Sequence, residues 1–128
     1  MVTVTLRGKV VSGVGEGRAF TSLDWARRQF REKLGFNPYA GTLNIQTIRE
    51  ENIELLRSSK GIQIDPPNGF LGGKCFTALI GKRIRGAVVI PDSSKHPSNV
   101  LEIIAPLSLR KELNLDDGDE VDVQVWLE

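Results

Sequence analysis

Alternating apolar and polar residues predict β-strands near both ends of the chain. Residues 2–11 are mostly β-branched, and residues 120–126 alternate strictly between polar and apolar side chains. A period of two residues turns one face of a strand toward a core and the other toward water. Similar short runs occupy residues 42–48, 61–64, 74–80, 84–90 and 99–105. The pattern therefore predicts a protein built mainly from short strands.

Turn residues separate these runs and keep most connections short. Gly81-Lys82-Arg83 joins two of them as a hairpin, and Asp117-Gly118-Asp119 forms a turn before the last strand. Parallel strands need crossover connections of about a dozen residues or more, which few gaps in this chain can supply. We therefore expect a largely antiparallel sheet, closed as a β-barrel with helical insertions.

One helix is clear from its spacing. Apolar residues recur at helical intervals through residues 23–34, with basic residues between them. Thr21 or Ser22 can cap its start, and Gly35 is a suitable stop. Two further segments are helix candidates: residues 49–60, which also fit a loop, and residues 106–113, with Pro106 at the first position.

Length and charge limit the classes of protein. The chain has 128 residues, which is about one domain with a single core. Its 17 basic and 16 acidic residues give a net charge of +1, without the basic excess of a typical nucleic-acid binder. No apolar run approaches the ~18 residues needed to span a membrane, and no signal peptide is evident. We expect a cytoplasmic monomer with no membrane or nucleic-acid partner.

The single cysteine, Cys75, excludes an intrachain disulfide and a cysteine-rich zinc site. Its neighbours are mostly apolar, which predicts a buried and unreactive thiol.

A glycine-rich segment follows the first strand and precedes the first helix. It reads Gly13-Val14-Gly15-Glu16-Gly17-Arg18. Glycines let backbone N–H groups approach phosphate oxygens, and the guanidinium of Arg18 suits phosphate. The spacing matches neither the Walker motif nor the dinucleotide fingerprint. A tight loop that needs positive φ angles explains the segment equally well.

Thr42 and Asn44 lie two residues apart on a predicted strand, so their side chains share one face. A hydroxyl and an amide oxygen are neutral, hard ligands. Magnesium accepts such ligands while it keeps waters and takes negative charge from substrate phosphates. The pair would bind the bare ion weakly, so the metal would arrive with a nucleotide. The alternative is a threonine and an asparagine that satisfy the turn after Gly41.

Glu102 lies within the apolar strand 100–104 and shares a face with Val100 and Ile104. Held in a site, it suits the role of general base; on a solvated barrel face, it is an ordinary acid. The segment Leu107-Ser108-Leu109-Arg110 could meet an anion, or could form a plain surface helix. His96 is the only histidine, and no Ser-His-Asp set can be built around it.

Four segments, in this order, resemble the archaeal CTP-dependent riboflavin kinases: residues 11–18, 34–44, 101–110 and 115–121. Each motif alone is weak, but four in order over nearly the whole chain are specific. The resemblance implies a mainly β fold, a six-stranded cradle-loop (RIFT-type) β-barrel with short helical insertions. It also implies a single kinase domain over residues 1–128, without an N-terminal helix-turn-helix domain.

The same resemblance implies an activity and a set of site residues. The reaction is transfer of the γ-phosphoryl group of CTP to the ribityl 5′-hydroxyl of riboflavin, assisted by magnesium, which gives FMN and CDP. Apart from the resemblance, the embedded position of Glu102 and the lack of a competing base in the motifs lead us to the hypothesis that Glu102 orients the attacking hydroxyl and accepts its proton. The implied contacts are Gly13 to Arg18 and Leu107 to Arg110 for the nucleotide, Thr42 and Asn44 for magnesium, and Ser94 and Glu102 for the flavin. Ser93 and Ser98 are competitors for the place of Ser94.

Two other functions stay open on the sequence alone. Residues 115–121 have the pattern Leu-x-x-Gly-Asp-x-Val, which swapped-hairpin DNA-binding barrels share, although the near-zero net charge argues against DNA. A non-catalytic flavin or nucleotide carrier would need similar contacts but would show no turnover.

Overall fold

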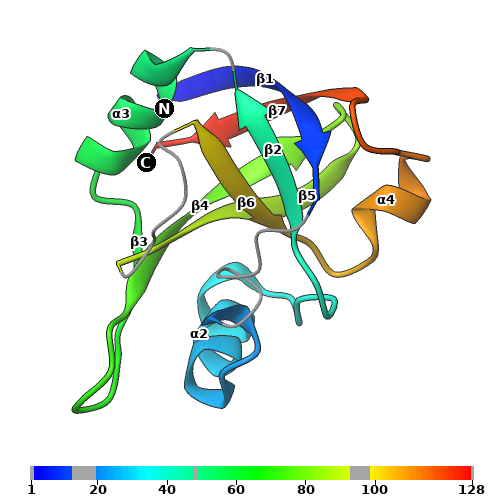
Figure 1. Cartoon of the computed structure of the whole chain (residues 1–128). Helices are drawn as coiled ribbons and strands as arrows, with labels where there is room; N and C mark the ends of the chain where they lie inside the picture. The colour runs from blue at the N-terminus through cyan, green and yellow to red at the C-terminus, as the bar shows by residue number, and fades with distance from the viewer. Residues whose placement is uncertain (1, 13–19, 48, 93–98, 128) are drawn as a thin grey trace.

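The computed structural model describes residues 2–12, 20–47, 49–92 and 99–127 (Figure 1). Its strands are β1 (Thr3–Val11), β2 (Leu43–Thr47), β3 (Ile62–Ile64), β4 (Gly73–Ile80), β5 (Ile84–Pro91), β6 (Val100–Ile104) and β7 (Glu120–Trp126). Its helices are α2 (Asp24–Leu34), α3 (Glu50–Ser58) and α4 (Leu109–Glu112). The mainly β architecture with short helical insertions is therefore confirmed.

Within the described residues, six strands pair in a closed ring. The order is β4-β5-β6-β2-β1-β7, and β7 pairs again with β4. Every pairing is antiparallel. The ring is uneven: β1 and β7 pair along most of their length, whereas β4 and β7 pair only from Ala78 to Ile80. The six-stranded barrel predicted from the sequence is confirmed.

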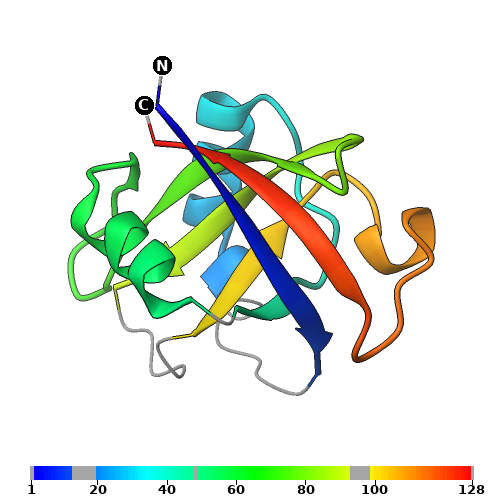
Figure 2. The same ribbon diagram turned by 90° about the horizontal axis from the view of Figure 1, so that it is seen from above.

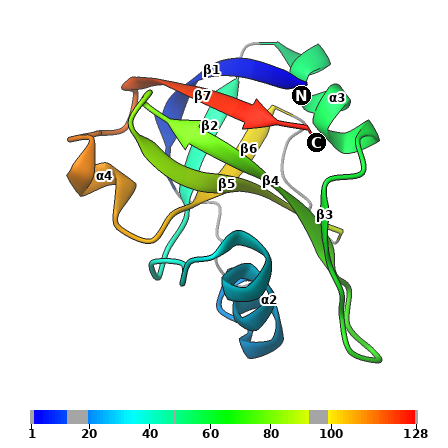
Figure 3. The same ribbon diagram turned by 180° about the vertical axis from the view of Figure 1, so that it is seen from behind.

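The short strand β3 lies outside the ring and pairs with the start of β4. The connection between them projects from the body as an arm, seen from opposite sides in Figures 1 and 3. Figure 2 shows β1 and β7 side by side across the barrel, with α3 and α4 at opposite ends of it.

Two cores hold the fold together, one inside the barrel and one outside it. Alternate residues of the strands fill the interior, including Leu6, Ile45 and Ile103, which are all fully buried. The outer core lies under α2, whose Ala26 and Phe30 pack in a cluster with other buried residues. That cluster contains Phe20, Ile64, Cys75, Ala87, Val89 and Ile104. As a result, β6 is buried on both of its faces.

The thiol of Cys75 is buried in the outer core, as the sequence predicts. Burial disfavours the thiolate and raises the pKa of Cys75 to about 12.

Helix α2 lies where the sequence predicts it, within one residue at each end, but its N-cap residue differs from the prediction. Gly35 takes a left-handed φ of 86°, and its N–H donates to the Arg31 carbonyl. The predicted cap at Thr21 or Ser22 is wrong for this helix. Leu23 occupies the N-cap position, and its apolar side chain offers no acceptor for a cap hydrogen bond. Its N–H donates to the Phe20 carbonyl.

The other two helix candidates are also settled by backbone geometry. Residues 49–60 contain the helix α3 rather than a loop. The predicted helix at residues 106–113 is shorter than expected, because Ser108 is the N-cap and accepts a hydrogen bond from the N–H of Lys111. Pro106 therefore precedes the helix and does not begin it.

Phe30→Ala should destabilise the fold by about 3–5 kcal/mol, because it leaves a cavity where a fully buried ring joins α2 to the sheet. Denaturant unfolding measures the change. Phe70→Ala is the matched control, since Phe70 is 55% exposed, and it should cost less than about 1 kcal/mol. Equal effects of the two variants would contradict the packing of α2 described above.

Candidate functional site

A row of directly paired residues crosses the outer face of the barrel. Val11 at the end of β1 pairs with Asn44 of β2. Asn44 also pairs with Glu102 of β6, which in turn pairs with Val89 of β5. Residues directly opposite in antiparallel strands point to the same face. Asn44 and Glu102 are therefore neighbours on the side of the sheet that carries α2.

Glu102 is the most deeply buried charged residue of the described chain, with 1% of its surface exposed. Asn44 beside it is 8% exposed. The expectation that Glu102 shares its face with Ile104 agrees with the outer-core packing of Ile104. Because burying a carboxylate costs free energy, its position is typical of a functional site. The alternative of a solvated barrel face is excluded.

Thr42 and Asn44 lie together, as their spacing predicts. The Thr42 hydroxyl donates to Asn44 Oδ1 at an oxygen–oxygen distance of 3.4 Å. Two ligands at 90° on an octahedral magnesium ion, each at 2.0–2.1 Å, are about 3 Å apart. A small adjustment would therefore let both oxygens reach one ion. The described residues hold no group of three or more His, Cys, Asp or Glu side chains suited to a metal.

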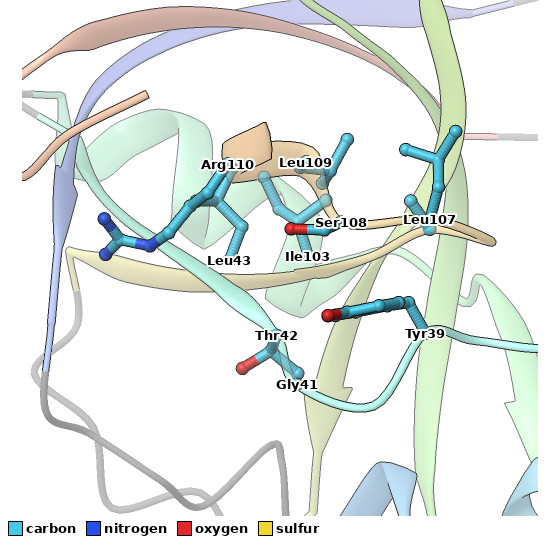
Figure 4. Close-up of a pocket in the computed structure, with 10 residues that line it drawn as sticks. Tyr39, Gly41, Thr42, Leu43, Ile103, Leu107, Ser108, Leu109 and Arg110 are labelled. Atoms are coloured by element: carbon cyan, nitrogen blue, oxygen red, sulfur yellow. The ribbon is translucent and has the colours of Figure 1, made fainter. Parts of the chain in front are cut away.

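A cleft of about 170 Å³ opens beside Thr42 (Figure 4). Its lining residues come from the turn before β2 and the first residue of β2, from the end of β6 and the segment after it, and from the start of α4: Tyr39, Gly41, Thr42, Leu43, Ile103, Ala105, Leu107, Ser108, Leu109 and Arg110. The cleft thus brings Thr42 together with all four residues of the predicted segment 107–110. Figure 4 shows Tyr39 facing Leu107 and Ser108 across it.

Tyr39 is a cleft residue that the sequence did not single out. Its backbone N–H donates to the Ala105 carbonyl at 2.7 Å, which attaches the turn before β2 to the end of β6. Gly41 follows with a φ of 114°, a conformation that favours glycine. Tyr39 lies in the segment 34–44 that carries part of the family resemblance, but nothing in that segment indicated which part of the chain it would face.

Arg110 reaches from the cleft toward the end of β1, as Figure 4 shows. Its Nη2 donates to Asp117 Oδ1 at 2.7 Å and to Ser12 Oγ at 3.1 Å. The Ser12 hydroxyl lies 2.7 Å from each carboxylate oxygen of Asp117. These hydrogen bonds, first from Ser12 and then from Arg110, lower the pKa of Asp117.

Some predicted site residues lie outside the described residues. These are the glycine segment from Gly13 to Arg18, the predicted flavin contact Ser94 and its competitors Ser93 and Ser98. The flanking strands are described. The chain leaves β1 at Val11, opposite Asn44. Residues 93–98 connect β5 to β6, the two strands that carry Val89 and Glu102.

A larger hollow of about 600 Å³ lies at the C-terminal end of α2. Leu34, Phe36, Arg85, Pro106 and Trp126 are among its lining residues, and of the predicted site residues that the structure describes, none lines it. The smaller cleft beside Thr42 is therefore the candidate site. No helix in the described part of the chain has the length and apolar character to cross a membrane.

Comparison with known proteins gives consistent matches. Residues 10–125 match a family model labelled as CTP-dependent riboflavin kinase and described as the domain of unknown function DUF120. A riboflavin kinase of Sulfurisphaera tokodaii is 46% identical over 129 residues, which cover 95% of this chain and 95% of the relative. One of Sulfolobus acidocaldarius is 45% identical, covering 97% of this chain and 82% of the relative.

Some relatives are longer. A riboflavin kinase of Archaeoglobus fulgidus is 45% identical over 131 residues, which cover 98% of this chain but only 56% of the relative. The chain therefore spans little more than half the length of that protein.

Proposed function

This chain belongs to the family of CTP-dependent riboflavin kinases, and on that premise we propose that it phosphorylates riboflavin at the ribityl 5′-hydroxyl. CTP is the donor, and the products are FMN and CDP. The observation that carries the proposal is a chain of direct neighbours: Thr42 lines the cleft together with residues 107–110, its hydroxyl bonds to Asn44, and Asn44 pairs directly with Glu102.

Phosphoryl transfer needs alignment and charge neutralisation more than covalent chemistry. Thr42 Oγ1 and Asn44 Oδ1 would hold a magnesium ion, which would supply positive charge to neutralise the phosphates of the nucleotide. The 3.4 Å separation of these oxygens supports shared ligation. Both ligands are neutral, so the site gains most of its metal affinity from the phosphates of the nucleotide.

Glu102 orients the 5′-hydroxyl of riboflavin and accepts its proton as the oxygen attacks the γ-phosphorus. Its direct pairing with Asn44 supports this role, because the base and the metal ligand must both reach the transferred group. Its burial supports it as well, since a site closed to bulk water limits hydrolysis of CTP.

The nucleotide lies along two segments in this proposal. Residues 107–110 form one wall of the cleft, and their position beside Thr42 supports contacts to the same triphosphate. Gly13 to Arg18 supply backbone N–H groups and the guanidinium of Arg18. Strand β1 ends at Val11, directly opposite Asn44, which supports that assignment. Ser94, which belongs to the connection between β5 and β6, contacts the flavin.

Two other functions predict different results. A swapped-hairpin DNA-binding module would bind DNA with a steep salt dependence, and a net charge of +1 gives it little support. A carrier would bind riboflavin or CTP without turnover. A gel-shift assay with DNA at low and at high salt tests the DNA-binding module. A DNA shift at low salt that disappears at high salt would favour that module, and no shift at low salt would exclude it.

Turnover separates the carrier from the kinase. The protein is incubated with riboflavin, CTP and magnesium, and the products are separated by chromatography. We expect FMN and CDP in equal amounts, and no FMN when a chelator removes the metal. Binding of riboflavin and CTP without FMN would leave the carrier as the function.

A further inference from the structure

Three segments that are distant in sequence meet at the side chains of Ser12, Arg110 and Asp117. Ser12 follows β1, Arg110 lies in α4, and Asp117 lies between α4 and β7. The Asp117 carboxylate accepts from Arg110 Nη2 at 2.7 Å and lies 2.7 Å from the Ser12 hydroxyl oxygen. Arg110 Nη2 also donates to Ser12 Oγ at 3.1 Å. Each of the three side chains thus contacts the other two, and we call Ser12, Arg110 and Asp117 the trio.

Backbone hydrogen bonds fix the carboxylate of this trio in place. The N–H of Val10 donates to the Asp119 carbonyl at 2.9 Å, and the N–H of Gly118 donates to the Val10 carbonyl at 2.8 Å. Gly118 has a φ of 92°, which favours glycine at this turn. The N–H of Leu115 donates to the Arg110 carbonyl at 2.8 Å. Asp117 therefore has a defined position relative to both β1 and α4.

The contacts use one nitrogen of the guanidinium. Of the described residues, Ser12 and Asp117 bond to Nη2, and none bonds to Nε or Nη1. A guanidinium carries five N–H donors in a planar fork, so an anion can still be bound through the other two nitrogens. Arg110 lines the same cleft as Thr42. A triphosphate that reaches Thr42 therefore passes within the range of this side chain.

We propose that Asp117 and Ser12 are positioning residues, which hold the Arg110 guanidinium ready for the triphosphate of the nucleotide. This inference rests on the proposed function. An unrestrained arginine loses rotamer freedom when it binds an anion, and prior fixation removes much of that cost. Asp117 and Ser12 act through Arg110 and make no contact with the nucleotide themselves.

The carboxylate of Asp117 stays ionised at assay pH. The lowered pKa of Asp117 leaves its carboxylate ionised far below neutral pH. The effect of Asp117 on nucleotide binding should therefore not change across neutral pH.

The test is the affinity of the full chain for two probes, CTP and inorganic tripolyphosphate, measured by calorimetry. Asp117→Ala should weaken the binding of both probes about five- to twentyfold, while the dissociation constant for riboflavin stays within about twofold of the wild-type value. Asp116→Ala is the matched control, since it removes a neighbouring exposed acid that makes no side-chain contact with Arg110. It should leave all three affinities within about twofold.

A double-mutant cycle shows whether Asp117 acts through Arg110. In an Arg110→Ala background, Asp117→Ala should change the affinity for CTP by less than about twofold. An equal loss in both backgrounds would overturn the inference. Should Asp117→Ala fail to fold, Ser12→Ala removes only one hydroxyl from the trio and should weaken both probes in the same direction.

The remaining outcomes separate the inference from the proposed function. Normal FMN formation, with an Asp117→Ala variant that binds CTP as the wild type does, overturns the inference alone. Wild-type protein that binds tripolyphosphate in an Asp117-dependent way but makes no FMN overturns the kinase and sustains the inference. Wild-type protein that binds neither probe overturns both.

Discussion

Glu102→Gln should lower kcat by about 10²–10⁴-fold, the contribution expected of a general base. Glutamine keeps the shape of the side chain but cannot accept the proton of the 5′-hydroxyl. Glu102 pairs directly with the proposed metal ligand Asn44 and is 1% exposed, so bulk water cannot easily replace it. Steady-state rates of FMN formation measure the change, with riboflavin binding followed by flavin fluorescence.

The control for Glu102 is Glu54→Gln, which makes the same chemical change at an exposed position on α3 and should leave kcat unchanged. The dissociation constant for riboflavin should change only a few-fold in Glu102→Gln, because the amide keeps a hydrogen-bonding oxygen. A fall in kcat of less than about tenfold would limit Glu102 to a binding role.

Asn44→Ala should lower kcat/KM by about 100-fold or more, because it removes one of the two proposed protein ligands of the metal that would neutralise the phosphates. The magnesium concentration for half-maximal activity should rise in the same variant. Thr42→Val should act in the same direction, since it deletes only the hydroxyl that lies 3.4 Å from Asn44 Oδ1. Magnesium titrations at saturating CTP and riboflavin measure both effects.

Gln46→Ala is the matched control for Asn44. Gln46 lies two residues further along β2 on the same face, but it is exposed, whereas Asn44 is buried and accepts a hydrogen bond from Thr42. Its removal should leave the magnesium dependence unchanged. Two results would contradict the metal assignment: an unchanged magnesium dependence in Asn44→Ala, or tight magnesium binding by the protein without nucleotide.

Local sequence patterns predicted most of the fold. Alternation and the glycine turns at residues 81 and 118 placed the strands, because both depend on neighbouring residues alone. The N-cap of α2 was predicted wrongly because Leu23, which occupies it, has no side-chain acceptor that a sequence pattern could reveal. The strand pattern indicated a closed barrel, but no local pattern indicated that β4 and β7 would close it, because these strands are distant in the sequence.

The candidate site divides in the same way. The shared face of Thr42 and Asn44 follows from a two-residue spacing on one strand. The pairing of Asn44 with Glu102 depends on the register between two distant strands, which no local pattern specifies. Ser12 and Asp117 were quoted only as parts of longer motifs. They are exposed polar residues, and their contact with Arg110 exists only once three segments have come together.

The central claim is that this chain makes FMN from riboflavin with CTP as the donor. The most direct measurement supplies riboflavin and magnesium with CTP, ATP, GTP or UTP in parallel and determines the FMN formed from each. We expect FMN with CTP, an equal amount of CDP, and at least about tenfold slower formation from the other three, a difference of about 1.4 kcal/mol in transition-state binding. Equal rates with ATP would contradict the choice of CTP, and no FMN from any of the four would contradict the kinase itself.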